Sequence, residues 1–387
     1  MVRLGQVAEF INGDRGKNYP SEGDFADKGI PFINAGHLTN GEVDFSDMNY
    51  ISESRFHLLG SGKTRQNDIL YCLRGSLGKT AIVHQKGDAA IASSLVIIRP
   101  SDDCSVGYLY HFLTSPFGHV EVRKFDNGSS QPNLSANSVK NYLLPLPPLT
   151  EQRRIAQILD KGEALQAKRR TALAQLDTLT QAIFLDMFGD PGRWPLVSLD
   201  SICRTIRDGT HKTPSYVQAG IPFITVKNMV TGSLHLTGAK FISPEEHQLL
   251  TKRVKPERGD ILVSKDGTIG AACPVATDSV FSIFVSVALL KLRTALVDQT
   301  FLVSQFRAPW VQRQIDDRIK GIAIRHLHLI DFKQLRVILP PLSLQHDFAQ
   351  RVAAVEKLRT AHRASLAQMD ALFASFQYRA FRGELWH

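Results

Sequence analysis

Over most of this chain, short apolar runs alternate with polar segments that contain glycine. In two segments, this pattern gives way to apolar residues at helical spacing. The runs at 69–73, 81–83, 95–99, 261–264 and 281–292 are bounded by Gly, Asn and Asp, which is typical of strands joined by turns. After Thr150, and again after Ser343, apolar residues recur at helical spacing for about 35 residues. The pattern predicts mixed α/β domains, each followed by one long helix.

The whole pattern occurs twice, with an offset of 191 to 195 residues that is far longer than the period of a solenoid repeat. The matched pairs are VRLGQVAEFI (2–11) with VSLDSICRTI (197–206), GIPFI (29–33) with GIPFI (220–224), NDILYCLRGSLG (67–78) with GDILVSKDGTIG (259–270), LPPLTEQRRIAQ (146–157) with LPPLSLQHDFAQ (339–350), and LAQLD (173–177) with LAQMD (366–370). Because order and spacing are both kept, we interpret the chain as a duplication. The predicted parts are a first domain (1–149), a central long helix (150–189), a second domain (190–340) and a C-terminal long helix (341–387).

Each long helix is expected to begin at Leu-Pro-Pro-Leu, where two prolines end the preceding strand, with Thr150 and Ser343 as N-caps. Both helices can be assigned a heptad seam. The seam residues are Ile155, Leu176 and Ile183 with Ile158, Leu165, Ala172 and Leu179 in the first helix, and Phe348, Val355, Met369 and Phe376 with Leu358 and Leu372 in the second. Such a stripe fits ordinary core packing equally well. Its occurrence in both repeats favours two helices packed as an antiparallel coiled coil about a pseudo-twofold axis.

The charge of the chain indicates an anionic partner. The net charge is +9, and the pI is about 9.4. Residues 191–339 carry +8 and residues 1–150 carry −1. If the anionic partner is DNA and both halves bind it, the first half requires a local basic patch or help from a partner. No apolar run approaches the ~18 residues of a membrane span, and the four cysteines form no CxxC pair. We therefore expect a cytoplasmic protein without a disulfide framework.

Sequence motifs of catalysis are broken or missing. The segment GSLGKT (75–80) lacks the first glycine of a phosphate-binding loop, because Leu73 stands there, so we interpret it as a turn between strands. His326 and His328 have no third metal ligand nearby. No GxSxG, HExxH or GxGxxG motif is present, nor the Asn/Asp-Pro-Pro-aromatic motif of amino-methylating DNA enzymes. We predict that the chain is not an enzyme and binds no metal.

Polar loops at matched positions of the two repeats are the candidates for function. The segment RDGTHKTPSY (207–216) combines donors, acceptors, a methyl group and positive charge, a mixture that base edges require whereas phosphates require only charge. Its counterpart is NGDRGKNYP (12–20). The residues predicted to contact DNA are Arg15, Lys17, Asn18, Tyr19, Arg74, Ser130 and Gln131 in the first repeat, and Thr210, His211, Lys212, Thr213, Lys227, Lys265 and Asp266 in the second.

The chain is duplicated, it uses LPPL…Q before a long helix twice, and it contains the segments GIPFI, DGTHKTPSY, GDILVSKDGTIG and GSSQPN. In these features, essentially the whole chain resembles the specificity subunit of a type I restriction-modification enzyme. The resemblance implies two target-recognition domains, each reading one half of a split double-stranded DNA site. It implies helices that set the spacer between the halves and dock two modification subunits. It also implies that S-adenosylmethionine, ATP and Mg²⁺ bind to the modification and restriction subunits, and that this chain holds no cofactor.

Two other classes of protein fit parts of the pattern. A DNA-modifying enzyme with its own recognition domain would carry one of the missing catalytic motifs. A scaffold that binds only protein would fill its loops with Tyr, Trp and Leu rather than with this polar mixture.

Overall fold

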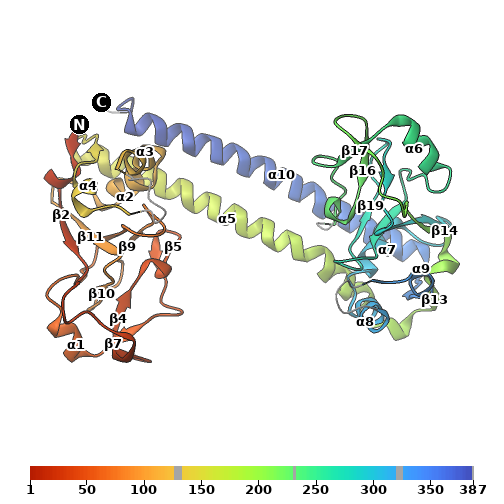
Figure 1. Ribbon diagram of the computed structural model, residues 1–387, viewed down its shortest axis with the longest axis horizontal. Helices are drawn as coiled ribbons and strands as arrows, with labels where there is room; N and C mark the ends of the chain where they lie inside the picture. The colour runs from red at the N-terminus through yellow and green to blue at the C-terminus, as the bar shows by residue number, and fades with distance from the viewer. Residues whose placement is uncertain (126–132, 230–231, 320–325, 386–387) are drawn as a thin grey trace. The chain divides into compact units, whose positions relative to one another are not determined.

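The computed structural model describes residues 1–387 except 126–132, 230–231, 320–325 and 386–387. The chain divides into two compact units (Figure 1). Unit 1 comprises Met1–Arg170 and Ala364–His387, and unit 2 comprises Thr171–Arg363. Each unit therefore contains one globular domain and about half of each long helix.

Unit 1 is built on a sheet in the order β2-β11-β8-β9-β6-β5. At its centre, β11 (Leu95–Pro100) pairs antiparallel with β2 (Ala8–Asn12) on one side and β8 (Ile69–Cys72) on the other. Its first four residues are apolar and fully buried, as expected of a strand covered on both faces. The other strands are β1 (Val2–Arg3), β3 (Phe25–Ala26), β4 (Ile30–Ile33), β5 (Leu38–Thr39), β6 (Glu42–Val43), β7 (Tyr50–Ile51), β9 (Thr80–Ile82), β10 (Ala90–Ile91) and β12 (Leu143–Leu144). The helices of the domain are α1 (Glu53–Leu58), α2 (Val106–Thr114), α3 (Pro116–Phe125) and α4 (Ala136–Lys140), with 3-10 turns η1 (Leu4–Gln6), η2 (Glu22–Asp24) and η3 (Ala35–His37).

Unit 2 contains two four-stranded sheets, one in the order β14-β21-β18-β19 and one in the order β15-β17-β16-β20. The strand β21 (Val287–Leu292) pairs antiparallel with β14 (Cys203–Asp208) and β18 (Ile261–Ser264). The other strands are β13 (Leu196–Ser198), β15 (Tyr216–Val217), β16 (Ile221–Ile224), β17 (Lys240–Ile242), β19 (Ala272–Pro274), β20 (Ser282–Ile283) and β22 (Arg336–Ile338). The helices are α6 (Pro244–Thr251), α7 (Gln299–Gln305), α8 (Pro309–Arg318) and α9 (Leu329–Lys333), with 3-10 turns η4 (Pro191–Arg193), η5 (Leu199–Ile202) and η6 (Val226–Asn228).

Matched sequence segments adopt matched local structures in the two units. The repeated IPFI forms β4 in unit 1 and β16 in unit 2, and each pairs in parallel with a two-residue strand. Gly75 and Gly267, with φ of 78° and 66°, lie in the turns that follow β8 and β18, where a left-handed backbone favours glycine. The predicted mixed α/β class is confirmed, and GSLGKT is the predicted turn between two strands, β8 and β9.

The two long helices are α5 (Leu149–Phe188) and α10 (Leu342–Phe381), each of 40 residues. Both begin at the last residue of LPPL, so the prediction that Thr150 and Ser343 are N-caps is wrong. A proline already has the φ of a helix, and the carbonyl groups of Pro148 and Pro341 accept the first hydrogen bonds, from the amides of Glu151 and Leu344. No described helix is long and apolar enough to cross a membrane.

A buried glutamine in the first turn ties each long helix to the preceding domain. Gln152 Oε1 accepts a hydrogen bond from the Ser105 amide at 2.8 Å, and its Nε2 donates to the carbonyl groups of Asp103 and Pro147, both at 2.9 Å. Gln345 makes the equivalent three bonds in unit 2, to the backbone of Asp298, Leu296 and Pro340. These contacts explain the glutamine of the repeated LPPL…Q motif.

Within each unit, α5 and α10 pack against each other in antiparallel orientation. In unit 1, the Phe373 ring lies so close to Gly162 that a Cβ there would be 2.8 Å from it, and Arg170 pairs with Asp370 at 3.3 Å. In unit 2, Arg359 pairs with Asp177 at 3.0 Å, and the rings of Phe184 and Phe348 are 5.6 Å apart.

The predicted seam is only partly the observed one. Ile155, Phe348 and Val355 are buried, as predicted. The predicted burial is wrong for the other seam position, whose larger residues are exposed: Ile158, Leu165, Leu179, Leu358 and Leu372. Aromatic side chains at the neighbouring positions, such as Phe184 and Phe373, take the contact instead, because their rings bury more apolar surface.

Candidate nucleic-acid interface

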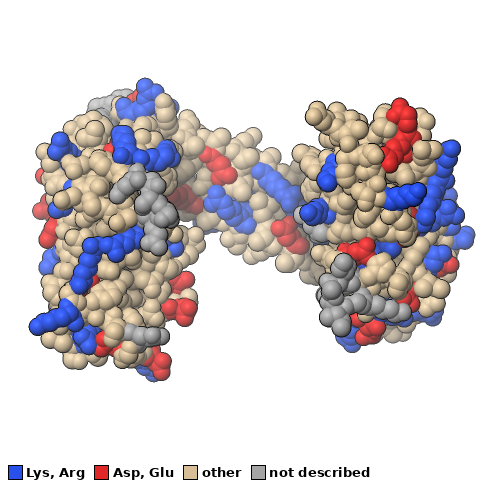
Figure 2. Space-filling view, in the orientation of Figure 1, with Lys and Arg blue, Asp and Glu red and all other residues tan. Residues whose placement is uncertain are grey.

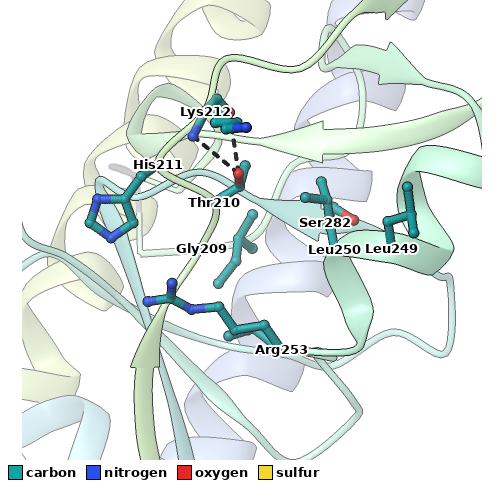
Figure 3. A pocket seen from close by; sticks show the side chains of 10 residues that line it. Gly209, Thr210, His211, Lys212, Leu249, Leu250, Arg253 and Ser282 are labelled. Atoms are coloured by element: carbon teal, nitrogen blue, oxygen red, sulfur yellow. Dashed lines mark hydrogen bonds between the residues drawn. The ribbon is translucent and has the colours of Figure 1, made fainter.

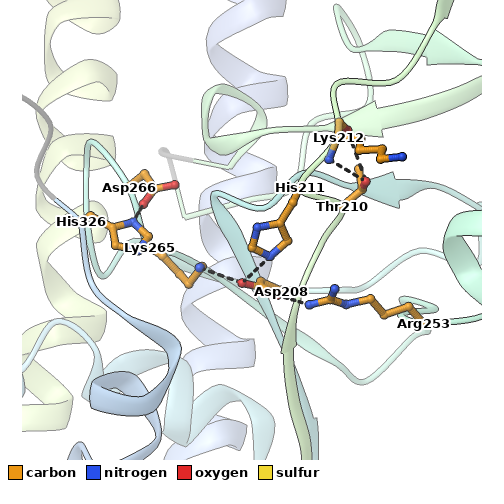
Figure 4. A network of polar contacts seen from close by, with 8 residues as sticks. All are labelled: Asp208, Thr210, His211, Lys212, Arg253, Lys265, Asp266 and His326. Atoms are coloured by element: carbon orange, nitrogen blue, oxygen red, sulfur yellow. Dashed lines mark hydrogen bonds and ion pairs between the residues drawn. The ribbon is translucent and has the colours of Figure 1, made fainter.

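The predicted recognition loop of unit 2 begins at a buried carboxylate. Asp208 is the last residue of β14, and its side chain is 6% exposed. Its Oδ2 accepts a hydrogen bond from the Lys265 ammonium at 2.9 Å, and its Oδ1 accepts one from the Arg253 guanidinium at 2.8 Å. His211 Nε2 lies 3.6 Å from Oδ2 (Figure 4). One acid thus joins the recognition loop to the turn after β18 and to the segment after α6.

The charge of Asp208 is maintained by these neighbours. Burial alone raises the pKa of this carboxyl group, but the hydrogen bond and charge of Lys265, with the charges of His211 and Arg253, outweigh burial. The pKa of Asp208 is therefore lowered from its ordinary value, and the group is ionised at neutral pH. An ionised acid at this point holds the cationic side chains around the start of the loop.

The loop itself is shaped by its first two residues. A Cβ on Gly209 would lie 2.0 Å from the Ile283 carbonyl oxygen, so the close approach of the two backbones requires glycine. Thr210 Oγ1 accepts a hydrogen bond from the Lys212 amide and donates one to its carbonyl group, both at 3.2 Å. His211, Lys212 and Thr213 are exposed as a result. His211 and Lys212 also line a cavity of about 290 Å³ between the loop, the end of α6 and β20 (Figure 3).

The structure separates the roles of two neighbouring predicted contact residues. Lys265 is only 2% exposed and its ammonium is engaged by Asp208, so this geometry supports a role in positioning the loop rather than the expected contact with a base. Asp266 is partly exposed, and its carboxylate contacts the imidazole of His326 (Figure 4). His326, considered as a metal ligand and rejected, thus helps to hold the turn after β18. The described residues contain no group of three or more His, Cys, Asp or Glu that could hold a metal.

The corresponding loop of unit 1 is also held by an acid at its start. Asp14 accepts hydrogen bonds from the amides of Gly16 and Gly60, both at 2.7 Å, and these bonds lower the pKa of its carboxyl group. Arg15 is exposed and donates to the Ser93 carbonyl at 3.3 Å. Lys17 is exposed.

Two of the predicted contact residues in this loop have structural partners. Asn18 Nδ2 donates to the Leu58 carbonyl at 2.9 Å, and the Tyr19 ring packs edge-on against Phe32 with a centroid distance of 5.7 Å. Both side chains therefore stabilise the loop, and Arg15 and Lys17 are left as its exposed cations.

The remaining predicted residues lie at separate places. Arg74 is exposed beside the turn after β8, and its backbone bridges to Asn133, as Asp266 bridges to His326 in unit 2. Lys227 is exposed on η6, whose shape depends on the hydrogen bond from the Thr225 amide to the side chain of Asn228. Ser130 and Gln131 lie outside the described residues.

Basic side chains gather on the edge of unit 2 that carries β14 (Figure 2). Along β14, Ile206 and Asp208 are buried and Arg207 between them is exposed, in the alternation of a half-buried strand. Arg204 is also exposed and lies at the register shift between Cys203 and Thr205. Sequence inspection placed Asp208 in the loop without selecting it as a site residue, and it missed Asp14 and Arg253. The importance of these residues depends on contacts with other parts of the fold.

Comparison with known proteins repeatedly finds one family. Residues 1–175 match the family model of the type I restriction modification DNA specificity domain. The type I restriction enzyme EcoBI specificity subunit of Escherichia coli is 29% identical over 313 residues, which cover 72% of this chain and 65% of that protein. The EcoKI specificity subunit of Escherichia coli strain K12 is 22% identical over 409 residues, 98% of this chain and 87% of that protein. Over nearly its whole length the chain is thus similar to specificity subunits of type I restriction enzymes.

A solved structure supports the fold of this chain. A chain from a structural study of complex assembly in a type I restriction-modification system has a TM-score of 0.66 at 19% identity, over 99% of this chain and 97% of that one. The predicted resemblance to type I specificity subunits is confirmed, and the relatives found are specificity subunits, in line with the prediction of a non-catalytic subunit. The individual contact residues stay predictions.

Proposed function

We propose that each unit reads one half of a bipartite DNA target and that the loops after β2 and β14 make the contacts with base edges. The observation that carries this proposal is the loop 209–213. Its backbone is constrained by Gly209, Thr210 and the Asp208 ion pairs, while the side chains of His211, Lys212 and Thr213 are exposed. A rigid scaffold that presents mixed donors and acceptors suits base reading.

The two loops carry different polar residues on similar strands, which supports two different half-sites. Unit 1 offers Arg15 and Lys17 at the position where unit 2 offers His211, Lys212 and Thr213. In our proposal Arg74 and Lys227 assist from neighbouring turns, and Lys265 acts through Asp208.

We further propose that α5 and α10 form an antiparallel coiled coil in a duplicated, pseudo-twofold arrangement, and that this pair sets the spacer and docks two modification subunits. Exposed apolar residues at heptad spacing support docking, because water contact with such a ridge is unfavourable until a partner covers it. They are Ile158, Leu165 and Leu179 on α5, and Leu358 and Leu372 on α10. S-adenosylmethionine, ATP and Mg²⁺ would bind to the modification and restriction subunits rather than to this chain.

Replacing His211, Lys212 and Thr213 together with alanine tests the proposal. Cells that carry the variant with its modification subunits should lose or relax one half of the methylated motif, because a base contact contributes ~1–3 kcal/mol of discrimination. The half read by unit 1 should stay intact, and sequencing of methylated sites measures both halves. The matched control is Lys255→Ala with Arg258→Ala, two exposed cations beyond the loop. If the triple variant leaves the methylated motif unchanged, the loop does not contact DNA. If recognition of both halves is lost equally, the loop contacts the DNA backbone and not the bases.

A further inference from the structure

We propose that a cavity beside α10 in unit 2 binds a phosphate group, carried either by a free nucleotide or by the backbone of a nucleic acid. The cavity has a volume of about 800 Å³ and lies between α5, α10, α7 and the segments around Gly232 and Pro274. It is separate from the recognition loop, shares no residue with the cavity there, and does not depend on the proposed function.

The counterpart of this cavity in unit 1 is filled by large side chains. The 193-residue offset of the repeat pairs Tyr110 with Val303, His111 with Ser304, and Phe373 with Thr180. In unit 1, His111 is fully buried with Nε2 2.7 Å from Asp160 Oδ1, and the Phe373 ring packs against Gly162. The smaller residues at all three positions of unit 2 line the open cavity.

Unit 2 has also gained positive charge at this place. Arg307 and Arg359, which line the cavity, stand where unit 1 has Thr114 and Gln166. The neighbour of Gly232 shows the difference between the units, since a Cβ on this glycine would be 2.2 Å from the Arg307 guanidinium. The matching Gly41 of unit 1, with almost the same φ, lies against the Tyr110 hydroxyl instead.

The extra arginine alters the ion pairing of the two helices. In unit 1, Arg170 pairs with Asp370, and the matching pair in unit 2 would be Arg363 with Asp177. Asp177 is instead paired with Arg359, which also pairs with Glu356 at 2.7 Å. Asp177 and Glu356 also line the cavity and are both engaged by Arg359, so among the described residues Arg363 and Arg307 face the cavity without an ion-pair partner.

Two buried donors in the lining residues also lack acceptors in the described part of the chain. They are Arg359 Nε and Gln181 Nε2. Buried donors are nearly always satisfied, so two in one place indicate a missing acceptor. Two unpaired guanidinium groups, with the hydroxyl group of Thr180 nearby, match the charge and the several acceptor oxygens of a phosphate.

Titration of the full-length chain with AMP, and separately with a short duplex that lacks the target, tests this inference at constant ionic strength. The test variants are Arg307→Gln, Arg363→Gln and Thr180→Phe, of which the last installs the unit 1 residue without changing charge. The control is Arg313→Gln, an exposed arginine of α8 outside the cavity. Melting temperatures of all variants establish that they are folded.

If the phosphate comes from a free nucleotide, each test variant should weaken AMP binding at least about tenfold while Arg313→Gln leaves it unchanged. If it comes from a nucleic-acid backbone, AMP binds weakly, and each arginine variant lowers the salt slope of duplex binding by about 1. The inference is overturned if the test variants behave like Arg313→Gln in both titrations. If the variants also leave the methylated motif unchanged, their effect on phosphate binding is separate from base recognition by the loops.

Discussion

At the residue scale, the equivalent strands β14 and β2 end with residues of different chemical type. Asp208 pairs across the sheet with Ala288, and Asn12 pairs with Val96. Lys265 follows β18 as Leu73 follows β8, so the buried ion pair of unit 2 corresponds to Asn and Leu in unit 1. Because a buried ion pair costs desolvation, it contributes less stability than its attraction suggests. Its retention in unit 2 is consistent with a role in orienting the loop.

Replacing Asp208 with Asn should lower the free energy of unfolding of unit 2 by about 3–5 kcal/mol, because the Lys265 ammonium is then buried without its acid. The double variant Asp208→Asn with Lys265→Leu installs the unit 1 residues and should recover most of this loss. Urea unfolding followed by the fluorescence of Trp194 and Trp310, both in unit 2, measures the change. A single variant as stable as the wild type would contradict this prediction.

The same ion pair predicts a pH dependence. Because the pKa of Asp208 in the folded chain is below its ordinary value of 3.8, its stabilising contribution is present above the unfolded pKa and is lost as pH falls through the folded pKa. The stability difference between the wild type and Asp208→Asn should therefore shrink as the pH is lowered below 3.8. Urea midpoints across this range measure it, and a difference that grows toward acid would show that the sign is wrong.

Sequence analysis was least successful at predicting the contacts and burial of individual side chains. The loop at 207–216 could be recognised from its composition, but the partners of Asp208 lie 45 and 57 residues away in the chain. Lys265 illustrates the consequence, since a lysine in a polar turn looks exposed and is buried here. Side-chain burial at a turn depends on tertiary packing, which no local pattern contains.

At the element scale, the junction between domain and long helix rests on one amide side chain in each unit. Gln345 is fully buried and satisfies one amide and two carbonyl groups of the backbone. An amide can both donate and accept, whereas a carboxylate can only accept. The residue type at this position is therefore dictated by the hydrogen bonds.

Gln345→Ala should destabilise unit 2 by at least about 2 kcal/mol, because several buried backbone groups lose their partners. Gln345→Glu should be equally harmful near neutral pH, since it cannot donate to the carbonyl groups of Leu296 and Pro340. The exposed Gln350→Ala on the same helix is the control. Hydrogen exchange in the first turn of α10, with the midpoint of thermal unfolding, tests this, and a Glu variant as stable as the wild type would be the contrary result.

The starts of the long helices were predictable to within one residue, because Leu-Pro-Pro-Leu stops one element and starts another. The end of α10 was not, since the helix was predicted to reach residue 387 and ends at Phe381. Neither was the face on which the two helices meet. Hydrophobic spacing assigned Ile158 and Leu165 to the seam, yet rings such as Phe373 occupy it. Periodicity shows that an apolar stripe exists, but side-chain size decides which part of it is covered.

At the scale of the whole molecule, the repeat predicted two domains, and each compact unit contains one of them together with parts of both helices. Charge was a weaker guide. The first 150 residues are net −1, and the candidate DNA contacts of unit 1 rest on a few exposed cations such as Arg15 and Lys17. We therefore expect the affinity of this half to depend more strongly on the modification subunits.

Our proposal that the helices act as a ruler predicts the effect of lengthening both of them. Seven residues inserted after Arg170 and seven after Arg363 keep the antiparallel partners Gly162 with Phe373 and Asp177 with Arg359 in register. One heptad is close to two helical turns, so the faces keep their orientation, and it adds about 10.5 Å at ~1.5 Å per residue. At ~3.4 Å per base pair the methylated motif should gain about three base pairs of spacer, with both half-sites unchanged.

The control for the ruler is the same insertion in α5 alone. It lengthens one helix past the other, so the contact at Gly162 and the ion pair at Asp177 can no longer both form, and methylation should fall without a defined new spacer. Sequencing of methylated sites distinguishes the two cases. If the double insertion changes the half-sites and leaves the spacer constant, the helices do not set the spacing. The separation of the half-sites would then have to come from the modification subunits that hold the chain on DNA.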